Sequence, residues 1–308
     1  MRQAGVGVIG LGHMGRSLAA NFLSGGFEIL VYDHNPAAVD AIVSTGAYRA
    51  GAISEFSQTP YVLTSLPDDV ALEAVAFGKN GLIETLKPGG IHISMSTVSP
   101  QLSRRLQDAH RAAGQGFVAA PVLGNPDLAA KRSLFILVAG HKPDLEKARP
   151  LLAPLADRIF ELGENAADAS LMKLAGNVMT AITLESMGEV LALLRKSGVD
   201  RHVAFDVLTN SLFDSKVHRA YGGKIVDERY SPAGMAVPLA VKDLRLALAE
   251  AEREAVPMPA ASLVHDRLVA LMARGWASLD WSALGLLAAR DAGLCASANS
   301  TDAAAHSP

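Results

Sequence analysis

The 308-residue chain has little of two things that would direct its chemistry, cysteine and clustered positive charge. Its one cysteine, Cys295, cannot form an intramolecular disulfide, so a reducing cytoplasm is the simplest setting. The formal net charge is −3, only 19% of residues are charged, and no basic block occurs. Nucleic acid and acidic membrane surfaces are therefore poor candidates for a partner, because binding to them needs clustered lysine and arginine.

Long uninterrupted apolar runs are also missing. Nowhere do about 18 apolar residues follow one another without a polar group, so we expect no membrane span. The N-terminal run MRQAGVGVIGLG is short and broken by glycines, which is unlike a secretory signal. The histidines form no HxxxH pair and no cluster with carboxylates, and no GxSxG elbow occurs. We expect a soluble cytoplasmic chain without a metal site or a serine nucleophile.

Hydrophobic residues make up 50% of the chain, which is ample for two domains. The first part alternates short apolar runs, predicted as strands, with helical segments. The predicted strands are residues 5–11, 28–33, 61–66, 91–96, 116–123, 134–139 and 158–162, and helices are predicted at residues 14–24, 36–45, 70–77 and 100–113. Several runs are continuously apolar, as in parallel strands covered on both faces. This pattern predicts an α/β fold with a doubly wound Rossmann sheet.

The character of the chain changes after Gly163, where strand patterns cease. Residues 242–254 form an amphipathic helical pattern, and Asp280 is placed as an N-cap. We predict an NAD(P)-binding domain over residues 1–163 and an all-α substrate and oligomerisation domain over residues 164–295. A long interdomain helix opens the second domain. Residues 296–308 lack an apolar period and are expected to be a disordered tail.

The segment GLGHMG comes directly after a predicted strand and directly before a predicted helix. Gly10 permits a tight turn, Gly12 lets a pyrophosphate approach the backbone, and Gly15 lets helix and strand pack closely. Leu11, His13 and Met14 complete the loop at the helix N-terminus, which faces the phosphates. The alternative is a glycine turn with a structural role alone.

Asp33 closes the second predicted strand, about 20 residues after the glycines, as a dinucleotide-binding fingerprint requires. Its carboxylate would accept hydrogen bonds from the adenosine ribose and would repel a 2′-phosphate. No arginine follows to receive that phosphate, so we predict NAD, with NADP possible. Alternatively, Asp33 is simply a turn residue.

Two further strands end in polar or proline-containing turns, Leu66-Pro67 and Ser96-Thr97. Ligands of open α/β sheets bind at the carboxyl ends of strands, which predicts that these residues contact the cofactor or the substrate. Thr97 would hydrogen-bond the nicotinamide side of the cofactor. From spacing alone, Ser96 and Thr97 could equally be an N-cap pair ahead of Pro100.

Lys173 stands in an apolar helical stretch, and Asn177 follows one turn later on the same face. A buried ammonium either extends to water or has its pKa lowered toward the working pH. The second outcome makes a proton-transfer catalyst.

Five segments in this order resemble the β-hydroxyacid dehydrogenase family: GLGHMG, STVSP, AAPVLGNP, GENAADASLMKLAGN and KDLRLA. That family includes 3-hydroxyisobutyrate dehydrogenase and the tartronate semialdehyde and glyoxylate/succinic semialdehyde reductases, and the resemblance covers nearly the whole chain. It implies that Lys173 is the catalytic lysine and Asn177 the site asparagine. It also implies that Thr97 binds the cofactor and that Lys242, expected at a helix start, reaches it near the nicotinamide.

The predicted substrate loop departs from the family, whose usual sequence is APVSGG. Here Leu123 replaces the serine, Gly124 is kept, and Asn125 replaces the second glycine. Backbone N–H groups of residues 123–125, together with Ser96, are expected to hold a substrate carboxylate.

We therefore predict a reversible NAD(P)-dependent oxidoreductase acting on a small β-hydroxy acid or semialdehyde, of 3-hydroxyisobutyrate or 2-hydroxy-3-oxopropionate type. Lys173 would be its general acid and base. The alternatives are an imine or other carbonyl reductase of the same fold and a non-catalytic NAD-binding interaction module. The apolar helix around residues 172–194 suggests a homodimer or homotetramer.

Overall fold

The computed structural model describes residues 5–294, whose contacts divide the chain into two compact units. The first unit ends at Leu174 and the second begins at Ala175. This division lies inside a long helix, whereas the sequence placed the boundary before that helix, at Gly163. The tail predicted to be disordered, residues 296–308, lies outside the described residues, as does Cys295.

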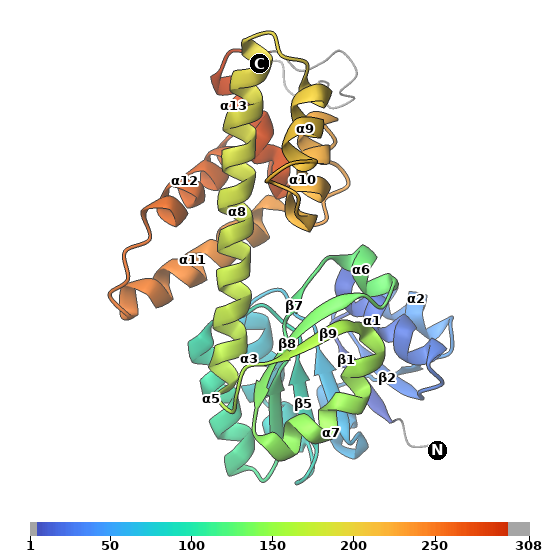
Figure 1. Cartoon of the computed structure of the whole chain (residues 1–308). Coiled ribbons are helices and arrows are strands. Elements are labelled where there is room, and N and C mark those ends of the chain that lie inside the picture. The colour runs from blue at the N-terminus through green and yellow to red at the C-terminus, as the bar shows by residue number, and fades with distance from the viewer. Residues whose placement is uncertain (1–4, 295–308) are drawn as a thin grey trace. The chain divides into compact units, whose positions relative to one another are not determined.

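Within the described residues, the first unit holds one nine-stranded sheet (Figure 1). Its strands follow the order β3-β2-β1-β4-β5-β6-β8-β7, and β9 pairs with β8 outside that path. They are β1 (Val6–Ile9), β2 (Ile29–Tyr32), β3 (Tyr48–Arg49), β4 (Tyr61–Thr64), β5 (Ile91–Ser94), β6 (Gly116–Ala119), β7 (Val122–Leu123), β8 (Leu134–Gly140) and β9 (Ala156–Glu161). The strand order reverses direction at β1, which makes the sheet doubly wound.

Strands β1 to β6 pair in parallel, and β8 is the exception. It runs antiparallel to β6 and β7 and parallel to β9. The prediction of one continuous strand over residues 116–123 is wrong, because Ala120 and Pro121 separate β6 from β7. Pro121 has no N–H to donate to a ladder, although its carbonyl still accepts the Leu137 N–H at 2.9 Å.

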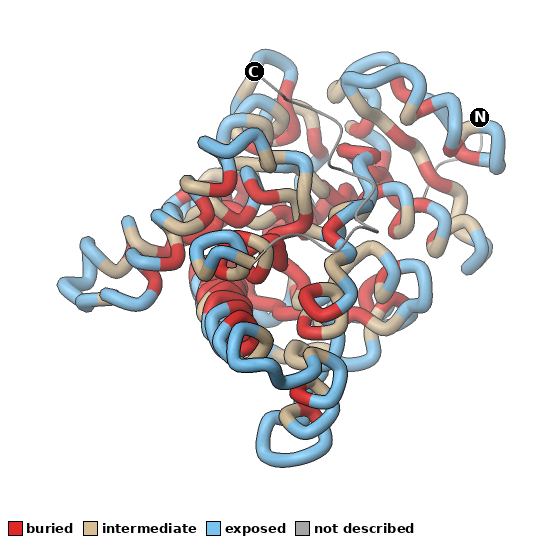
Figure 2. Tube along the Cα trace, turned by 90° about the horizontal axis from the view of Figure 1, so that it is seen from above, coloured by how far each residue is buried: buried red, intermediate tan, exposed pale blue. Residues whose placement is uncertain are grey.

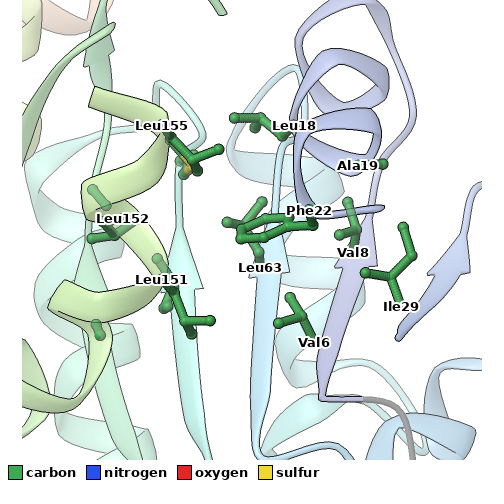
Figure 3. Packing of buried hydrophobic residues seen from close by; sticks show 14 of the residues in the cluster. Val6, Val8, Leu18, Ala19, Phe22, Ile29, Leu63, Leu151, Leu152 and Leu155 are labelled. Atoms are coloured by element: carbon green, nitrogen blue, oxygen red, sulfur yellow. The ribbon is translucent and has the colours of Figure 1, made fainter. Parts of the chain in front are cut away.

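Helices cover both faces of the sheet. One face carries α1 (His13–Ser24), α2 (Pro36–Val43), α6 (Pro126–Ala130) and α7 (Lys142–Leu152), which continues into η2 (Ala153–Leu155). The other carries η1 (Ile53–Gln58), α3 (Asp69–Phe77), α4 (Leu82–Thr85) and α5 (Pro100–Ala112). On the first face, Phe22 of α1 lies over Val8 and Leu63, and Leu152 of α7 packs in the same cluster (Figure 3). These apolar contacts hold the sheet rigid and leave its carboxyl edge for the connecting loops.

The second unit is helical apart from an isolated bridge between Ala236 and Asp280. The long helix α8 (Ala166–Lys196) runs from the first unit into it. It is followed by α9 (Arg201–Thr209), α10 (Lys216–Val226), α11 (Val237–Arg253), α12 (Pro259–Ala273), η3 (Trp281–Ala283) and α13 (Leu284–Asp291). Buried and exposed residues alternate along the helices, so each turns one side inward (Figure 2). Asp280 caps η3 as predicted, since its carboxylate accepts the Ser282 N–H at 3.1 Å.

Among the described helices, α8 alone is long and apolar enough to meet the length and composition test for a membrane span. Half of its most apolar window is buried inside the protein. The helix also carries buried Lys173, Asn177 and Glu185. These are properties of a core helix that supports polar groups.

Candidate active site

The glycine turn after β1 combines two tight positions with one open position. Gly10 has φ +91°, and a Cβ there would lie 2.3 Å from the Ser65 carbonyl oxygen. A Cβ at Gly15 would lie 1.9 Å from the Gly10 oxygen, whereas a Cβ at Gly12 would meet no atom within 4 Å. The chain's own packing thus requires the first and third glycines, and the space at the second admits an approaching pyrophosphate.

The residues between these glycines leave the start of α1 open to an anion. Gly12 is the N-cap without a side-chain hydrogen bond, and the first turn holds no acidic residue. Leu11 is buried, Met14 is partly buried, and His13 is exposed. The backbone N–H groups and the positive end of the helix dipole can therefore stabilise phosphate oxygens here.

Asp33 joins the end of β2 to the glycine turn. Its Oδ2 accepts the Leu11 N–H at 2.6 Å, and its Oδ1 accepts the Asn35 N–H at 2.8 Å. Asp33 thus serves as a turn residue and also brings a carboxylate beside the turn. A negative charge in this position repels a 2′-phosphate and suits ribose hydroxyls.

The strand register brings the other predicted cofactor residues to the same edge. Ile9 pairs with Tyr32 and Thr64, and Thr64 pairs with Ser94, so these strands end level with one another. The segments that follow, Leu66-Pro67 and Ser96-Thr97, therefore leave the sheet beside the glycine turn. Leu66 is partly buried, Pro67 is exposed, and Thr97 is partly buried.

Ser96 links two of these strand ends. Its side chain is buried, and its Oγ accepts the Leu66 N–H at 2.8 Å. The alternative that Ser96 and Thr97 cap the following helix is wrong. Ser99 is the N-cap of α5, because its Oγ accepts the Leu102 N–H at 3.1 Å.

The loop at residues 123–125 follows the short strand β7. Leu123 pairs with Phe135 and packs against the same buried cluster as Leu66. Gly124 is exposed, and Asn125 is the N-cap of α6. The Asn125 Oδ1 accepts the Leu128 N–H at 2.9 Å, so this oxygen already has a structural role that sequence reasoning missed.

Lys173 and Asn177 lie one turn apart on α8 and are 8% and 5% exposed. Of the two alternatives for a lysine in this apolar stretch, the burial argues against a side chain that extends into bulk water. An ammonium held away from water is a group that proton transfer can use.

Asp243 of α11 adds a carboxylate that sequence reasoning did not single out, although it directly follows Lys242. It is 2% exposed, and its Oδ2 accepts the Asn177 Nδ2–H at 2.5 Å. The Lys242 Nζ lies 3.0 Å from its Oδ1. The expectation that Lys242 opens a helix is wrong: α11 begins at Val237, with Pro238 in its first turn, where proline is tolerated.

A buried chain of polar side chains reaches the end of β4 and was also missed. Thr64 Oγ1 lies 2.9 Å from His92 Nε2, and His92 Nδ1 lies 2.9 Å from His110 Nε2. His110 Nδ1 then lies 2.6 Å from the Gln115 Oε1. Burial lowers the pKa of both histidines, that of His110 to about 4. Both rings are therefore neutral at neutral pH and are structural groups. Within residues 5–294, no group of three or more His, Cys, Asp or Glu side chains could hold a metal ion.

Two family models match successive parts of the chain. The model described as the NAD binding domain of 6-phosphogluconate dehydrogenase matches residues 5–163. The model described as NAD-binding of NADP-dependent 3-hydroxyisobutyrate dehydrogenase matches residues 167–287.

Individual relatives match along most of their length. An uncharacterised oxidoreductase of Bacillus subtilis, YfjR, is 38% identical over 91% of this chain and 98% of its own. Glyoxylate/succinic semialdehyde reductase 1 of Arabidopsis thaliana is 32% identical, over 91% and 96%. A solved structure of 3-hydroxyisobutyrate dehydrogenase from Salmonella typhimurium superposes with a TM-score of 0.82 at 25% identity, covering 92% of this chain and 99% of that one.

Proposed function

Because the chain belongs to the β-hydroxyacid dehydrogenase family, whose members are NAD(P)-dependent oxidoreductases, we propose that it interconverts a small β-hydroxy acid and the matching semialdehyde. The observation that carries the proposal is the buried pair on α8, Lys173 and Asn177, of which Asn177 is bonded to Asp243. Relatives named for glyoxylate, succinic semialdehyde and 2-hydroxy-3-oxopropionate reduction support a small acidic substrate.

Lys173 moves the proton in this proposal. In oxidation it accepts the proton of the substrate hydroxyl, and in reduction its ammonium protonates the carbonyl oxygen. A bound nicotinamide supplies or accepts the hydride. Asn177 holds the reacting oxygen through its side-chain amide, which Asp243 orients by accepting an Nδ2–H hydrogen bond. Backbone N–H groups of residues 123–125 hold the carboxylate.

A lysine-to-alanine substitution tests this assignment. Lys173→Ala should lower kcat by several orders of magnitude and leave NAD affinity within about twofold, because the lysine acts on the substrate and not on the dinucleotide. Lys147→Ala, an exposed lysine of the first unit, is the control and should retain full activity. A Lys173→Ala enzyme that turns over near the wild-type rate would disprove the role.

We propose NAD as the preferred cofactor, with NADP as the weaker one. The support is Asp33, whose carboxylate lies beside the glycine turn and would repel a 2′-phosphate. Measuring kcat/KM with NAD and with NADP tests the preference. In Asp33→Ser, the ratio of the value with NAD to the value with NADP should fall at least tenfold. A wild-type enzyme that favours NADP would overturn it.

We propose a homodimer or homotetramer that works in the cytoplasm. In the second unit, Met179, Val190 and Leu193 of α8 are 71%, 41% and 66% exposed. Their spacing puts them on one face of the helix, and several large apolar side chains exposed along one helix face support an interface there. Leu193→Glu should lower the mass measured by light scattering, whereas Val70→Glu on α3 should not. A monomeric wild-type protein would contradict the assembly.

A further inference from the structure

We propose that the first unit has a second ligand site, a cavity at the amino edge of its sheet that binds a small zwitterion through one cationic and one anionic side chain. The cavity has a volume of about 290 Å³, and Arg111 of α5 and Asp144 of α7 both line it. This site goes beyond the proposed function and does not depend on it, because no residue of the proposed chemistry lines the cavity.

The cavity lies at the opposite edge of the sheet from the glycine turn. Gln115 and Phe117, which also line it, flank Gly116, the first residue of β6. Gly116 pairs with Ile91, the first residue of β5, so strand starts form this edge. Cofactors of open α/β sheets bind at the carboxyl ends of the strands, where the glycine turn lies. A molecule bound in the cavity is therefore separate from the proposed nicotinamide site.

Two opposite charges that border the cavity have no partner in the protein. Arg111 lies in the last turn of α5, and Asp144 lies in the first turn of α7. Within residues 5–294, neither side chain has a hydrogen-bond or ion-pair partner, so the guanidinium nitrogens lie more than 4.0 Å from the carboxylate oxygens. An unpaired cation and an unpaired anion thus border the same space, with room for a ligand between them.

Each charge is held in its place by local structure. A cation is stabilised at the carboxyl end of a helix and an anion at the amino end, which are the positions of Arg111 and Asp144. Gly116 lets the Asp144 carboxylate lie against the start of β6, because a Cβ at this glycine would lie 2.6 Å from the Asp144 Oδ1. The two charges therefore keep their positions without pairing with each other.

The other polar side chains of the cavity do not change this pattern of charge. Gln107 and Gln115 are buried neutral amides, and each donates a hydrogen bond to a nearby backbone carbonyl oxygen. The His141 Nδ1 lies 4.0 Å from a Glu164 carboxylate oxygen, so this ring has an acid of its own beside it. The ionic groups of a ligand are therefore selected by the guanidinium of α5 and the carboxylate of α7.

The chemistry of these two groups defines the ligand. A guanidinium binds a carboxylate through parallel N–H bonds, and a carboxylate accepts hydrogen bonds from an ammonium. A simple anion would leave Asp144 unpaired, and a simple cation would leave Arg111 unpaired, whereas a zwitterion satisfies both. Pockets for small molecules have volumes of about 300 to 1,000 Å³, so this cavity suits a small metabolite with a short apolar frame and not a dinucleotide.

A ligand-observed NMR titration of the full-length protein tests the site. The probes are β-alanine and 4-aminobutanoate as zwitterions, with propanoate and propylamine as matched single ions. At least one zwitterion should bind with a Kd on the order of 1 mM, and either single ion should bind at least tenfold more weakly. Arg111→Gln and Asp144→Asn should each weaken the zwitterion at least tenfold, because each removes one ionic partner.

Three further variants serve as controls. Arg104→Gln and Glu146→Gln change exposed charges elsewhere on α5 and α7 and should bind the zwitterion as wild type does. Lys173→Ala should also bind it as wild type does, because the cavity does not include the lysine. If Asp144→Asn does not fold, Arg111→Gln decides the test, since that position is exposed.

The site is overturned if neither zwitterion binds. It is also overturned if propanoate binds as tightly as the zwitterions and with the same dependence on Arg111, because the site would then recognise an anion alone. Zwitterion binding that survives Arg111→Gln or a folded Asp144→Asn, or that Lys173→Ala removes, places the molecule elsewhere and overturns the proposal as well. None of these results decides the proposed function, which the turnover of Lys173→Ala tests separately.

Discussion

The buried histidine pair of the first unit makes a prediction about acid stability. Gln115 Nε2 donates to the Leu86 and Ile83 carbonyl oxygens, so its Oε1 faces His110 as an acceptor. His110 therefore carries its proton on Nδ1 and accepts on Nε2, and His92 in turn donates from Nδ1. Thr64 completes the chain by donating to His92 Nε2. Every link requires neutral rings, so a proton added to either imidazole breaks one hydrogen bond.

The size of the effect follows from the pKa of His110. Burial lowers it from 6.5 to about 4 in the folded protein, against a smaller raising effect of the Gln115 hydrogen bond. The unfolded chain therefore binds the proton first as the pH falls, and stability present above pH 6.5 is lost toward pH 4. At roughly 1.4 kcal/mol per pKa unit the total from His110 is about 3 kcal/mol, of which about 2 kcal/mol is lost by pH 5. His92, whose pKa is also lowered, adds a loss of the same sign.

Urea unfolding at pH 8 and pH 5, followed by far-UV circular dichroism, measures this loss. Tryptophan fluorescence would report the second unit alone, because Trp276 and Trp281 both lie there. His110→Leu should lower stability at pH 8 by roughly 1–3 kcal/mol, since it leaves buried partners unpaired. Its deficit should shrink by about 2 kcal/mol at pH 5. His34→Gln, whose imidazole is 95% exposed, is the control and should follow wild type at both pH values.

A deficit that stays constant between pH 8 and pH 5 would refute the argument. Ring resonances of the wild-type protein give a second test that needs no variant. If the imidazole of His92 or His110 titrates above pH 6, the buried neutral chain is wrong.

Three further predictions concern the glycine turn, the acid of α11 and the acid that caps η3. Gly15→Ala should lower both the melting temperature and the NAD affinity, because its Cβ would collide with the backbone. Gly12→Ala should weaken NAD binding, measured by calorimetry, with little change in melting temperature, because a Cβ there meets no atom of the protein. Asp243→Asn should lower kcat at least tenfold and change the pH profile, measured by steady-state kinetics, because it alters the partner of Asn177. Asp280→Ala should destabilise the second unit by about 3–5 kcal/mol, followed by tryptophan fluorescence, since it removes the buried partner of a lysine ammonium and of several N–H groups.

Apolar runs and helix-start prolines predicted most of the first unit, because those signals are local. Strands β1, β2, β4 and β5 lie inside their predicted ranges, and α5 begins at Pro100 as expected. Strand β3 has only two residues, both exposed, and is therefore too short to give a strand pattern. The antiparallel course of β8 could not be predicted, since strand direction is decided by packing between distant segments and not by composition.

The candidate site, too, has some features that the sequence predicts and others that it does not. The tight turn at Gly10 and Gly15 and the position of Asp33 at a strand end were predictable, because turns and strand ends are short-range features. The cap formed by Ser99 was open to prediction as well, since serine directly before proline is a common helix start. Asp243 was not, because its bond to Asn177 joins residues 66 positions apart.

Lys173 and Asn177 keep a fixed distance from each other because both lie on helix α8, although the two compact units of the chain meet between them. Lys173 belongs to the first unit and Asn177 to the second, with the division after Leu174. Both lie well inside α8, and four residues of helix rise amount to about 6 Å. The backbone hydrogen bonds of the helix hold that spacing, so the proton-transfer group and the amide are set by local structure. A proline in this turn, for instance at Gly176, would remove one of those bonds and kink the helix. It should therefore abolish turnover even if both units remain folded, which circular dichroism and NAD binding would verify.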